Sequence, residues 1–386
     1  MPAMVEALTL SAAGERAAGS LDRPPRHVLH VLPGFGVGGI QVRLARIVNA
    51  LGRCFRHTIL SLDGDISCRE RIDPALDVVV ESLAMRGRIV ARLDACARRI
   101  RRAAPDLLAT YNWDAIEWAM ANQMFARVRH LHFEDGFGPE EAVRPLWRRG
   151  ILRRLALMRT AAVVVPSHAL ERVAIDRWQL PASRVIHLPN GVEVGDFRDT
   201  PAGEPLFARR ADEIVVGTVA PLRPEKNLAR LLGAFNRVDQ PSVRLAIVGD
   251  GGERPMLEML ADGLGIADRV LFVGAVREPQ RALALFDIFA LSSDTEQMPM
   301  TVLEAMAAGL PVVAVDVGDL KHMLAPANRA FVVPRGEAAL AEALAALVAD
   351  GGRRHALGRL NRVHVSAKYP FARMLEGYRR LLGEPA

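Results

Sequence analysis

The sequence has few of the residues that mark a secreted or membrane-spanning protein. It has only three cysteines among 386 residues, and three cannot all pair within one chain. No apolar run approaches the roughly 20 residues that a helix needs to span a bilayer. Residues 1–26 lack the apolar core of a signal peptide and predict a disordered leader. These absences favour the cytoplasm as the location of the protein.

Lysine is also scarce. Lys226, Lys321 and Lys368 are the only lysines among 50 basic residues, and the others are arginine. The formal net charge is +6, but aromatic residues do not interleave with the arginines and no nucleic-acid-binding motif is present. The charge therefore does not predict a nucleic-acid partner. A rare lysine in a ligand-binding loop is more informative, and Lys226 follows a predicted strand.

Strand-like apolar runs alternate with helical stretches along the chain, which predicts an α/β fold with parallel sheets. One series of strands runs from His27–Leu32 to Val185–Leu188, and a second runs from Ile214–Val219 to Phe331–Val333. The segment between them is rich in proline, glycine and charge, which is typical of a linker. The predicted divisions are an N-terminal domain at 27–195, a linker at 196–211, a C-terminal domain at 212–366 and a final helical segment at 367–386.

The most informative segment runs from Asp294 to Asp319. Glu296 and Glu304 lie eight residues apart, and Met298-Pro299 between them fits the start of a helix. Both carboxylates are then expected at the carboxyl ends of a parallel sheet, where open α/β folds bind ligands. A carboxylate accepts two hydrogen bonds at once, which suits the hydroxyls of a ribose or another sugar. A random pair of this kind is more often two solvated glutamates beside a helix.

This segment resembles the E-x7-E element of retaining glycosyltransferases of family 4. The family has the GT-B fold, in which two Rossmann-like α/β/α domains face each other across a cleft. The resemblance implies that Glu304 binds the nucleotide ribose and that Glu296 is a catalytic residue beside the transferred sugar. The family commonly reads E-G-F-P where this chain reads Glu296-Gln297-Met298-Pro299. Gln297, Met298 and Pro299 are therefore expected to shape the part of the donor site that holds the sugar.

The resemblance extends to two loops that would handle phosphate. Gly38 and Gly39 open a helix after the first strand and would bring backbone N–H groups to the donor diphosphate. Lys226 matches the family lysine that neutralises the departing diphosphate. The family arginine falls on Pro221, and Arg223 is the nearest cation that could replace it.

The resemblance also implies roles for residues at other strand ends. Gly249 and the pair Val273-Gly274 are expected near the nucleotide base and donor. His132 ends the fifth strand and is expected to face the cleft and contact the donor sugar. A last group, expected at the acceptor rim, comprises Asn112, Trp113 and Asp135. The plainer interpretation of Asn112 and its neighbours is a helix cap.

The resemblance implies a retaining enzyme that transfers a sugar from a UDP-sugar or GDP-sugar to a hydroxyl acceptor. The N-terminal domain would bind a glycan or lipid-linked acceptor, the C-terminal domain would bind the nucleotide sugar, and the last helix would brace the first domain. Synthesis of envelope polysaccharide or glycolipid is the common role of such enzymes. The sequence has no cluster of histidine, cysteine and acidic residues at the spacing of a metal site, so we expect no metal cofactor.

Two other functions fit parts of the sequence. Residues 34–39 read G-x-G-x-x-G and Asp63 follows the second strand, as in an NAD-dependent oxidoreductase. A sugar-nucleotide epimerase of the same fold would need no acceptor. Residues 144–159 form a basic amphipathic stretch, with Trp147, Ile151, Leu155 and Met158 at helical spacing. This helix would lie on the inner, anionic face of a membrane or pack on its own sheet.

Overall fold

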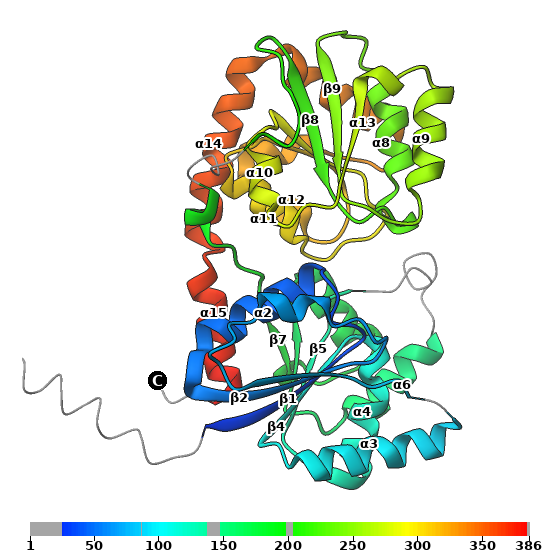
Figure 1. Ribbon diagram of the computed structural model, residues 1–386, viewed down its shortest axis with the longest axis vertical. Helices are drawn as coiled ribbons and strands as arrows, with labels where there is room; N and C mark the ends of the chain where they lie inside the picture. Colours follow the sequence, from blue (N-terminus) through cyan, green and yellow to red (C-terminus); the bar gives the residue numbers. More distant parts are fainter. Residues whose placement is uncertain (1–24, 86, 137–146, 198–203, 384–386) are drawn as a thin grey trace, which may run out of the picture.

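The computed structural model describes residues 25–85, 87–136, 147–197 and 204–383. These residues form two α/β domains, which lie one above the other in Figure 1. Each domain has a parallel sheet with helices on both faces, so the predicted GT-B architecture is confirmed. The predicted leader, 1–26, lies outside the described residues except for its last two, and Arg26 already belongs to the first strand.

The N-terminal sheet has seven parallel strands in the order β3-β2-β1-β4-β5-β6-β7. Their bounds are Arg26–Leu32 (β1), Phe55–Ser61 (β2), Val78–Ser82 (β3), Leu107–Tyr111 (β4), His130–Phe133 (β5), Ala162–Val165 (β6) and Val185–His187 (β7). Neighbouring strands pair in register, as in Val31 opposite Leu60 and Thr110 opposite His132. The strands β1, β2, β4, β5 and β6 are buried on both faces, which explains why they read as nearly continuous apolar runs.

The C-terminal sheet has six parallel strands in the order β10-β9-β8-β11-β12-β13. Their bounds are Ile214–Val219 (β8), Val243–Val248 (β9), Val270–Gly274 (β10), Ile288–Leu291 (β11), Val312–Val315 (β12) and Val332–Val333 (β13). This is the strand order of a dinucleotide-binding fold, in which the order reverses between the first and fourth strands. The reversal here lies between β8 and β11, so a ligand site is expected where these two strands end.

The helices pack their apolar faces on the two sheets. In the N-terminal domain they are Gly39–Leu51 (α2), Ile89–Ala103 (α3), Ile116–Ala121 (α4), Trp147–Leu157 (α6) and His168–Arg172 (α7). In the C-terminal domain they are Leu228–Asn236 (α8), Arg254–Gly263 (α9), Pro279–Leu283 (α10), Met300–Ala307 (α11), Leu320–Met323 (α12), Glu337–Ala349 (α13) and Gly351–Lys368 (α14). Separate hydrophobic cores fill the two domains.

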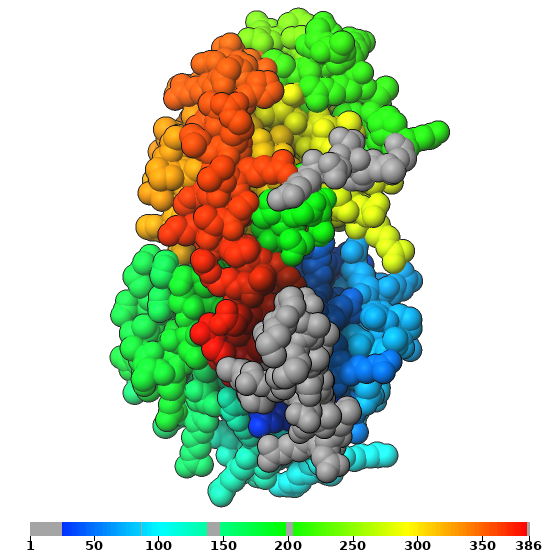
Figure 2. Space-filling model, turned by 90° about the vertical axis from the view of Figure 1, so that its left-hand side faces the viewer, coloured from blue at the N-terminus to red at the C-terminus, as the bar shows by residue number. Residues whose placement is uncertain are grey.

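Two segments connect the domains, and they lie side by side. Val192 pairs with Pro370, and just beyond it the chain continues into Phe371–Leu382 (α15). Helix α15 packs on the N-terminal domain, where Tyr378 stacks on Phe133 with ring centroids 5.3 Å apart. Figure 2 shows α14 and α15, in orange and red, running down one side of the molecule from one domain to the other.

The first connection lies earlier in the chain than predicted. Val192 and Phe197 are buried in the core of the C-terminal domain, although residues up to 195 were assigned to the N-terminal domain. The polar composition of residues 196–211 suggests a linker that packs on neither domain. Phe197 lies in this range, but its side chain packs in the core of the C-terminal domain. Residues 198–203 lie outside the described part of the chain.

Candidate active site

The loops that follow β8 and β11 bring a lysine and a glutamate together. Lys226 lies before α8 and Glu296 lies before α11, and Lys226 Nζ is 2.6 Å from Glu296 Oε1. Their side chains are 21% and 11% exposed, so the pair is partly shielded but open to a small ligand. The two residues are 70 positions apart in sequence and meet because their strands are neighbours at the point where the strand order reverses.

A second set of contacts holds these loops in place. The Asp294 carboxylate accepts hydrogen bonds from Asn227 Nδ2 at 2.9 Å and from Arg230 Nη2 at 2.6 Å. The Ser292 hydroxyl donates to the backbone oxygen of Lys226 at 3.0 Å. The backbone that carries Lys226 is therefore fixed to the backbone that carries Glu296, which keeps the two side chains in position.

Glu304 lies on α11 and is partly buried, and no hydrogen bond to its carboxylate is found among the described residues. Burial raises the pKa of Glu304 to about 7, although the charges of Arg46 and Arg71 act in the opposite direction. These arginines belong to the N-terminal domain, so Glu304 faces the domain junction. A carboxylate without a partner at this place is free to accept hydrogen bonds from a ligand.

The glycine loop of the N-terminal domain lies against the start of α11. Gly38 precedes α2 in an extended conformation. A Cβ atom built on Gly39 would be 4.0 Å from Met300 Cγ, which belongs to the other domain. The amide groups at the start of α2 therefore point toward the same junction as α11. Asp63, the acid that an NAD site would need, is engaged by Ser61 Oγ at 3.0 Å and by the Asp65 amide at 2.9 Å.

The other predicted phosphate and base residues lie at the ends of neighbouring strands. Arg223 is exposed in the loop between β8 and α8. Gly249, after β9, has φ of +139°, and a Cβ atom there would come within 1.9 Å of the Ala220 oxygen. Its amide donates to the oxygen of Gly274 at 2.8 Å, next to the half-buried Val273. Only glycine fits this close approach of three chain segments.

Residues between the two glutamates form hydrogen bonds across the domain junction. Gln297 Oε1 accepts a hydrogen bond from Ser167 Oγ at 2.9 Å, and the Met298 backbone oxygen accepts one from Asn190 Nδ2 at 2.8 Å. Pro299 is buried directly before α11. Gln297 and Met298 were expected to shape the donor site, and in the structure both side chains are buried against the N-terminal domain and the segment that leaves it.

A buried arginine is the main functional candidate that the sequence did not reveal. Arg43, on α2, forms two hydrogen bonds to the Asp135 carboxylate, at 2.6 and 2.7 Å, and a third to Asn190 Oδ1. Because Asn190 also bonds Met298, a continuous series of polar contacts joins Asp135 to the loop before α11. The signal in the sequence was an arginine within the apolar face of a helix, next to Leu44.

Asp319 ends the segment that was most informative in the sequence, and it contacts the N-terminal domain. Its carboxylate accepts hydrogen bonds from the His168 and Ala169 amides, at 2.6 and 3.0 Å, and so caps the first turn of α7 in the other domain. Its own amide donates to the Gln297 oxygen at 3.1 Å. Asp319 therefore joins the loop before α11 to the N-terminal domain.

The prediction that His132 faces the cleft is wrong in this structure. His132 is fully buried, with Nδ1 2.8 Å from Thr110 Oγ1 and Nε2 3.3 Å from Glu134 Oε2. Arg153 Nε donates to the same Glu134 oxygen at 3.1 Å. Every residue of β5 is buried, so the sequence could not show which face of the sheet His132 would occupy.

The three predicted acceptor residues are close together but are already engaged. Asp135 is paired with Arg43, and its amide donates to Asn112 Oδ1 at 2.8 Å. The guanidinium carbons of Arg149 and Arg153 lie 5.0 and 4.9 Å from the centre of the Trp113 ring. Trp113 is half-buried, so the edge of its ring is the part of this group that could contact an acceptor.

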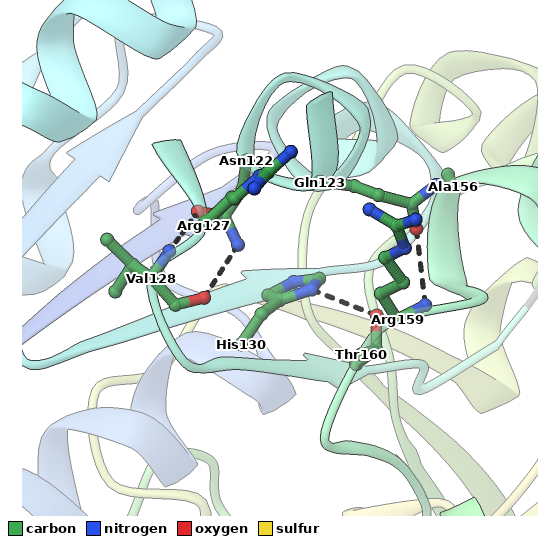
Figure 3. Close-up of a pocket in the computed structure, with 8 residues that line it drawn as sticks. All are labelled: Asn122, Gln123, Arg127, Val128, His130, Ala156, Arg159 and Thr160. Carbon is green, nitrogen blue, oxygen red and sulfur yellow. Dashed lines mark hydrogen bonds between the residues drawn. The ribbon is translucent and has the colours of Figure 1, made fainter. Parts of the chain in front are cut away.

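A separate pocket lies at the opposite end of the N-terminal sheet (Figure 3). Its volume is about 240 Å³ and it is lined by Asn122, Gln123, Arg127, Val128, His130, Ala156, Arg159 and Thr160. His130 begins β5, and its two ring nitrogens lie 2.7 and 3.0 Å from threonine hydroxyls. Burial lowers the pKa of His130 to about 3, so this ring stays neutral. The pocket is therefore distinct from the site around Lys226.

Each of the two domains matches the model of a known protein family. Residues 37–196 match the family described as Glycosyltransferase Family 4, and residues 206–363 match Glycosyl transferases group 1. This chain belongs to the family 4 glycosyltransferases. The N-terminal match begins inside the glycine loop, and the C-terminal match contains Lys226, Glu296 and Glu304.

The chain is similar to several bacterial proteins. It is 31% identical over 238 residues to the GDP-mannose-dependent alpha-(1-6)-phosphatidylinositol monomannoside mannosyltransferase of Mycobacterium tuberculosis; the match covers 57% of this chain and 61% of that protein. It is 27% identical over 365 residues to the 2-deoxystreptamine N-acetyl-D-glucosaminyltransferase of Streptomyces fradiae, covering 82% and 84% of the two chains. The match thus spans less than two thirds of the mannosyltransferase.

Solved structures share the fold of this chain. The HepE protein of Anabaena, solved with UDP and glucose, has a TM-score of 0.78 and 20% identity, covering 93% of this chain and 100% of that one. WaaG, a glycosyltransferase involved in lipopolysaccharide biosynthesis, has a TM-score of 0.72 and 17% identity, again covering 93% and 100%. At these identities the likeness shows the fold alone.

Proposed function

We propose that this protein transfers a sugar from a nucleotide diphosphate sugar to a hydroxyl group of an acceptor, with retention of the anomeric configuration. The observation that carries the proposal is the arrangement of Lys226, Glu296 and Glu304 at the ends of β8 and β11, facing the N-terminal domain. A rare lysine can neutralise a diphosphate, and an unpartnered carboxylate can bind a ribose diol. Both groups lie where open α/β folds bind nucleotides.

In this proposal the lysine and the glycine loop stabilise the leaving group. Lys226, the exposed Arg223 and the amides of Gly38 and Gly39 meet the charge that develops on the departing diphosphate. Glu296 holds Lys226 in place before the donor binds and then lies beside the transferred sugar. The nucleotide base packs near Gly249 and Val273-Gly274. His132 is buried between Thr110 and Glu134, and it has no role in the proposed transfer.

The transfer step needs no side chain of the protein as a base. The bond between the anomeric carbon and the phosphate oxygen breaks as the acceptor oxygen bonds to the same carbon from the same face. The acceptor proton passes to the departing phosphate oxygen. Because protein cations and amides stabilise the diphosphate, the transfer step proposed here uses no metal. Full activity in EDTA is the expected result, and a requirement for added manganese would contradict it.

We further propose that the acceptor is a glycan or lipid-linked sugar at the cytoplasmic face of a membrane, in envelope polysaccharide or glycolipid synthesis. In the described part of the chain no helix is long and apolar enough to cross a bilayer. The apolar stripe of α6 nevertheless faces outward: Trp147 is 69% exposed and Leu155 48% exposed. Arginines beside this stripe suit an anionic lipid surface. Arg153 is the exception, since it is buried against Glu134. Residues 144–146 of the predicted helix lie outside the described residues.

Binding measurements test the proposal directly. We would titrate UDP, GDP, ADP and NAD into the purified protein by calorimetry, with Glu304→Ala as the matched variant. Binding of UDP or GDP that this substitution abolishes would support the donor site and select the nucleotide. Binding of NAD alone, unaffected by the substitution, would overturn the proposal in favour of an oxidoreductase.

The products then separate transfer from epimerisation. A transferase consumes the nucleotide sugar only when an acceptor is present, apart from slow hydrolysis, and proton NMR of the glycoside shows whether the configuration is retained. Conversion of the nucleotide sugar into its epimer without an acceptor would identify an epimerase instead.

A further inference from the structure

Two histidines and a glutamate meet on the N-terminal domain beside the domain junction. His168 begins α7, Glu171 follows one turn later, and His187 ends β7. Strand β7 pairs with β6 so that His187 lies opposite Val165, just before the loop that leads to α7. Each of the three residues offers one ligand atom, and these atoms all lie within 4.8 Å of one another. The sequence did not show this cluster, because strand pairing and not spacing brings His187 to the other two.

The hydrogen bonds of the two imidazoles suit metal binding. His187 Nε2 is 3.2 Å from the Pro166 oxygen; since a carbonyl only accepts, Nε2 carries the hydrogen and Nδ1 keeps its lone pair. A ligating histidine usually donates its other N–H in this way. His168 Nδ1 is 3.0 Å from Glu171 Oε2. A tetrahedral zinc with bonds of about 2.0–2.1 Å sets neighbouring ligand atoms at a similar separation.

The charges around the cluster also favour a cation. The rings of His168 and His187 are 3.9 Å apart, so two protonated imidazoles would repel each other. The acids that face the cluster are Glu171, on the same helix, and Asp319, from the other domain. His322, also from the other domain, has its ring 6.4 Å from that of His168.

We infer that His168, Glu171 and His187 bind a zinc ion, or another transition metal that prefers imidazole, beside the domain junction. Two nitrogens and one carboxylate oxygen fit zinc, whereas magnesium and calcium prefer oxygen ligands alone. The metal takes the place of the hydrogen between His168 and Glu171, and water completes its coordination. The site uses none of the residues assigned to the donor, so this inference is independent of the proposed function.

Bound zinc would fix the start of α7 to the end of β7. The backbone amides of His168 and Ala169 are the groups that hold Asp319 of the C-terminal domain. The metal therefore stabilises the surface on which the second domain docks, and it takes no part in sugar transfer. A higher midpoint of thermal unfolding in zinc than in EDTA is expected from binding to the folded state alone.

Calorimetry with zinc on protein that lacks a histidine tag and was treated with EDTA tests the inference. We expect one zinc per chain, and an affinity reduced about 10- to 100-fold or more in His187→Ala and in Glu171→Gln. Cobalt should give the visible absorption of a tetrahedral site, and His187→Ala should remove it. The matched control is His355→Ala, which removes an exposed histidine on α14 and should bind zinc as the wild type does.

Three results would overturn the inference. These are the absence of zinc binding, binding that His187→Ala leaves unchanged, and weak binding of several ions that His355→Ala reduces equally. Circular dichroism shows whether each variant is folded. UDP or GDP binding should be the same in His187→Ala and wild type, so failure of the zinc site and failure of the donor site give different results.

Discussion

The side-chain amide of Asn190 donates a 2.8 Å hydrogen bond to the backbone oxygen of Met298, and through it the N-terminal domain holds the loop before α11. The other end of the Asn190 side chain accepts a bond from Arg43, which is paired with Asp135. One buried side chain thus connects an expected acceptor residue with the loop that carries Glu296. The geometry of the site therefore depends on the relative position of the two domains.

Asn190→Ala should destabilise the protein by about 2–3 kcal/mol, because it removes two buried bonds and leaves part of a buried guanidinium unpaired. Urea unfolding measures this as a lower midpoint with an unchanged slope. The matched control is Asn49→Ala, which also loses two hydrogen bonds but on an exposed surface, and should cost less than about 1 kcal/mol. Equal losses of stability in the two variants would show that the burial of Asn190 does not increase the contribution of its hydrogen bonds.

Lys226→Met should lower kcat for sugar transfer by about 100- to 1000-fold, because it removes a preorganised charge from the leaving diphosphate. Lys368→Met is the control, since that lysine is exposed in the last turn of α14. It should change kcat less than about twofold. Steady-state rates with the nucleotide sugar identified by calorimetry give both values. A Lys226→Met enzyme with normal kcat would remove the lysine from the mechanism.

Glu304 should make nucleotide binding depend on pH. Its pKa is raised to about 7 by burial, and the ionised form is the one that accepts hydrogen bonds from ribose hydroxyls. Affinity should therefore fall about tenfold between pH 8 and pH 6, following the fraction ionised. Glu304→Gln should bind more weakly at pH 8 and show no such fall. A wild-type affinity that is constant over this range would contradict the assignment.

The same pKa predicts how stability depends on pH in the absence of nucleotide. The folded state keeps a proton on Glu304 that the unfolded state releases above its ordinary value of 4.5. Stability contributed by this group is therefore present at low pH and is lost as pH rises from 4.5 through about 7. The loss is at most about 3 kcal/mol. Urea unfolding of Glu304→Gln should lack this contribution when compared with the wild type.

Gly249→Ala should be destabilising by about 2 kcal/mol or more, because φ of +139° is strained for alanine and its Cβ atom would meet the Ala220 oxygen. Gly252→Ala, three residues along the same loop, is the control: no atom lies within 4 Å of its Cβ position. That substitution should be neutral or slightly stabilising. The midpoints of urea unfolding distinguish the two, and identical midpoints would show that the loop relaxes.

Much of the fold was predictable because parallel strands buried on both faces read as apolar runs. Strand β8 has the predicted bounds, and β1, β7 and β13 each differ from the predicted bounds by one residue at one end. The pairing of Lys226 with Glu296 was also accessible, since both follow strands that meet at the reversal of strand order. The sequence signal for this site is local: a short loop, a strand end and a charged residue.

The polar contacts at the domain junction were not predictable in the same way. Arg43 and Asn190 are 147 residues apart, and Asn190 and Met298 are 108 apart, so no local spacing relates them. When both faces of a strand are buried, the sequence also does not show on which face of the sheet a side chain lies, as for His132. These contacts depend on how two finished domains meet, and that is decided by packing.

The position of α15 has a consequence for biosynthesis. Tyr378 on this helix covers Phe133 in the N-terminal domain, yet the ribosome makes α15 only after the whole C-terminal domain. At ordinary rates of translation, the nascent N-terminal domain would expose this apolar face for on the order of 10 s or more. The first domain to be synthesised is therefore the last to be completed, and the uncovered face is a natural place for a chaperone to bind.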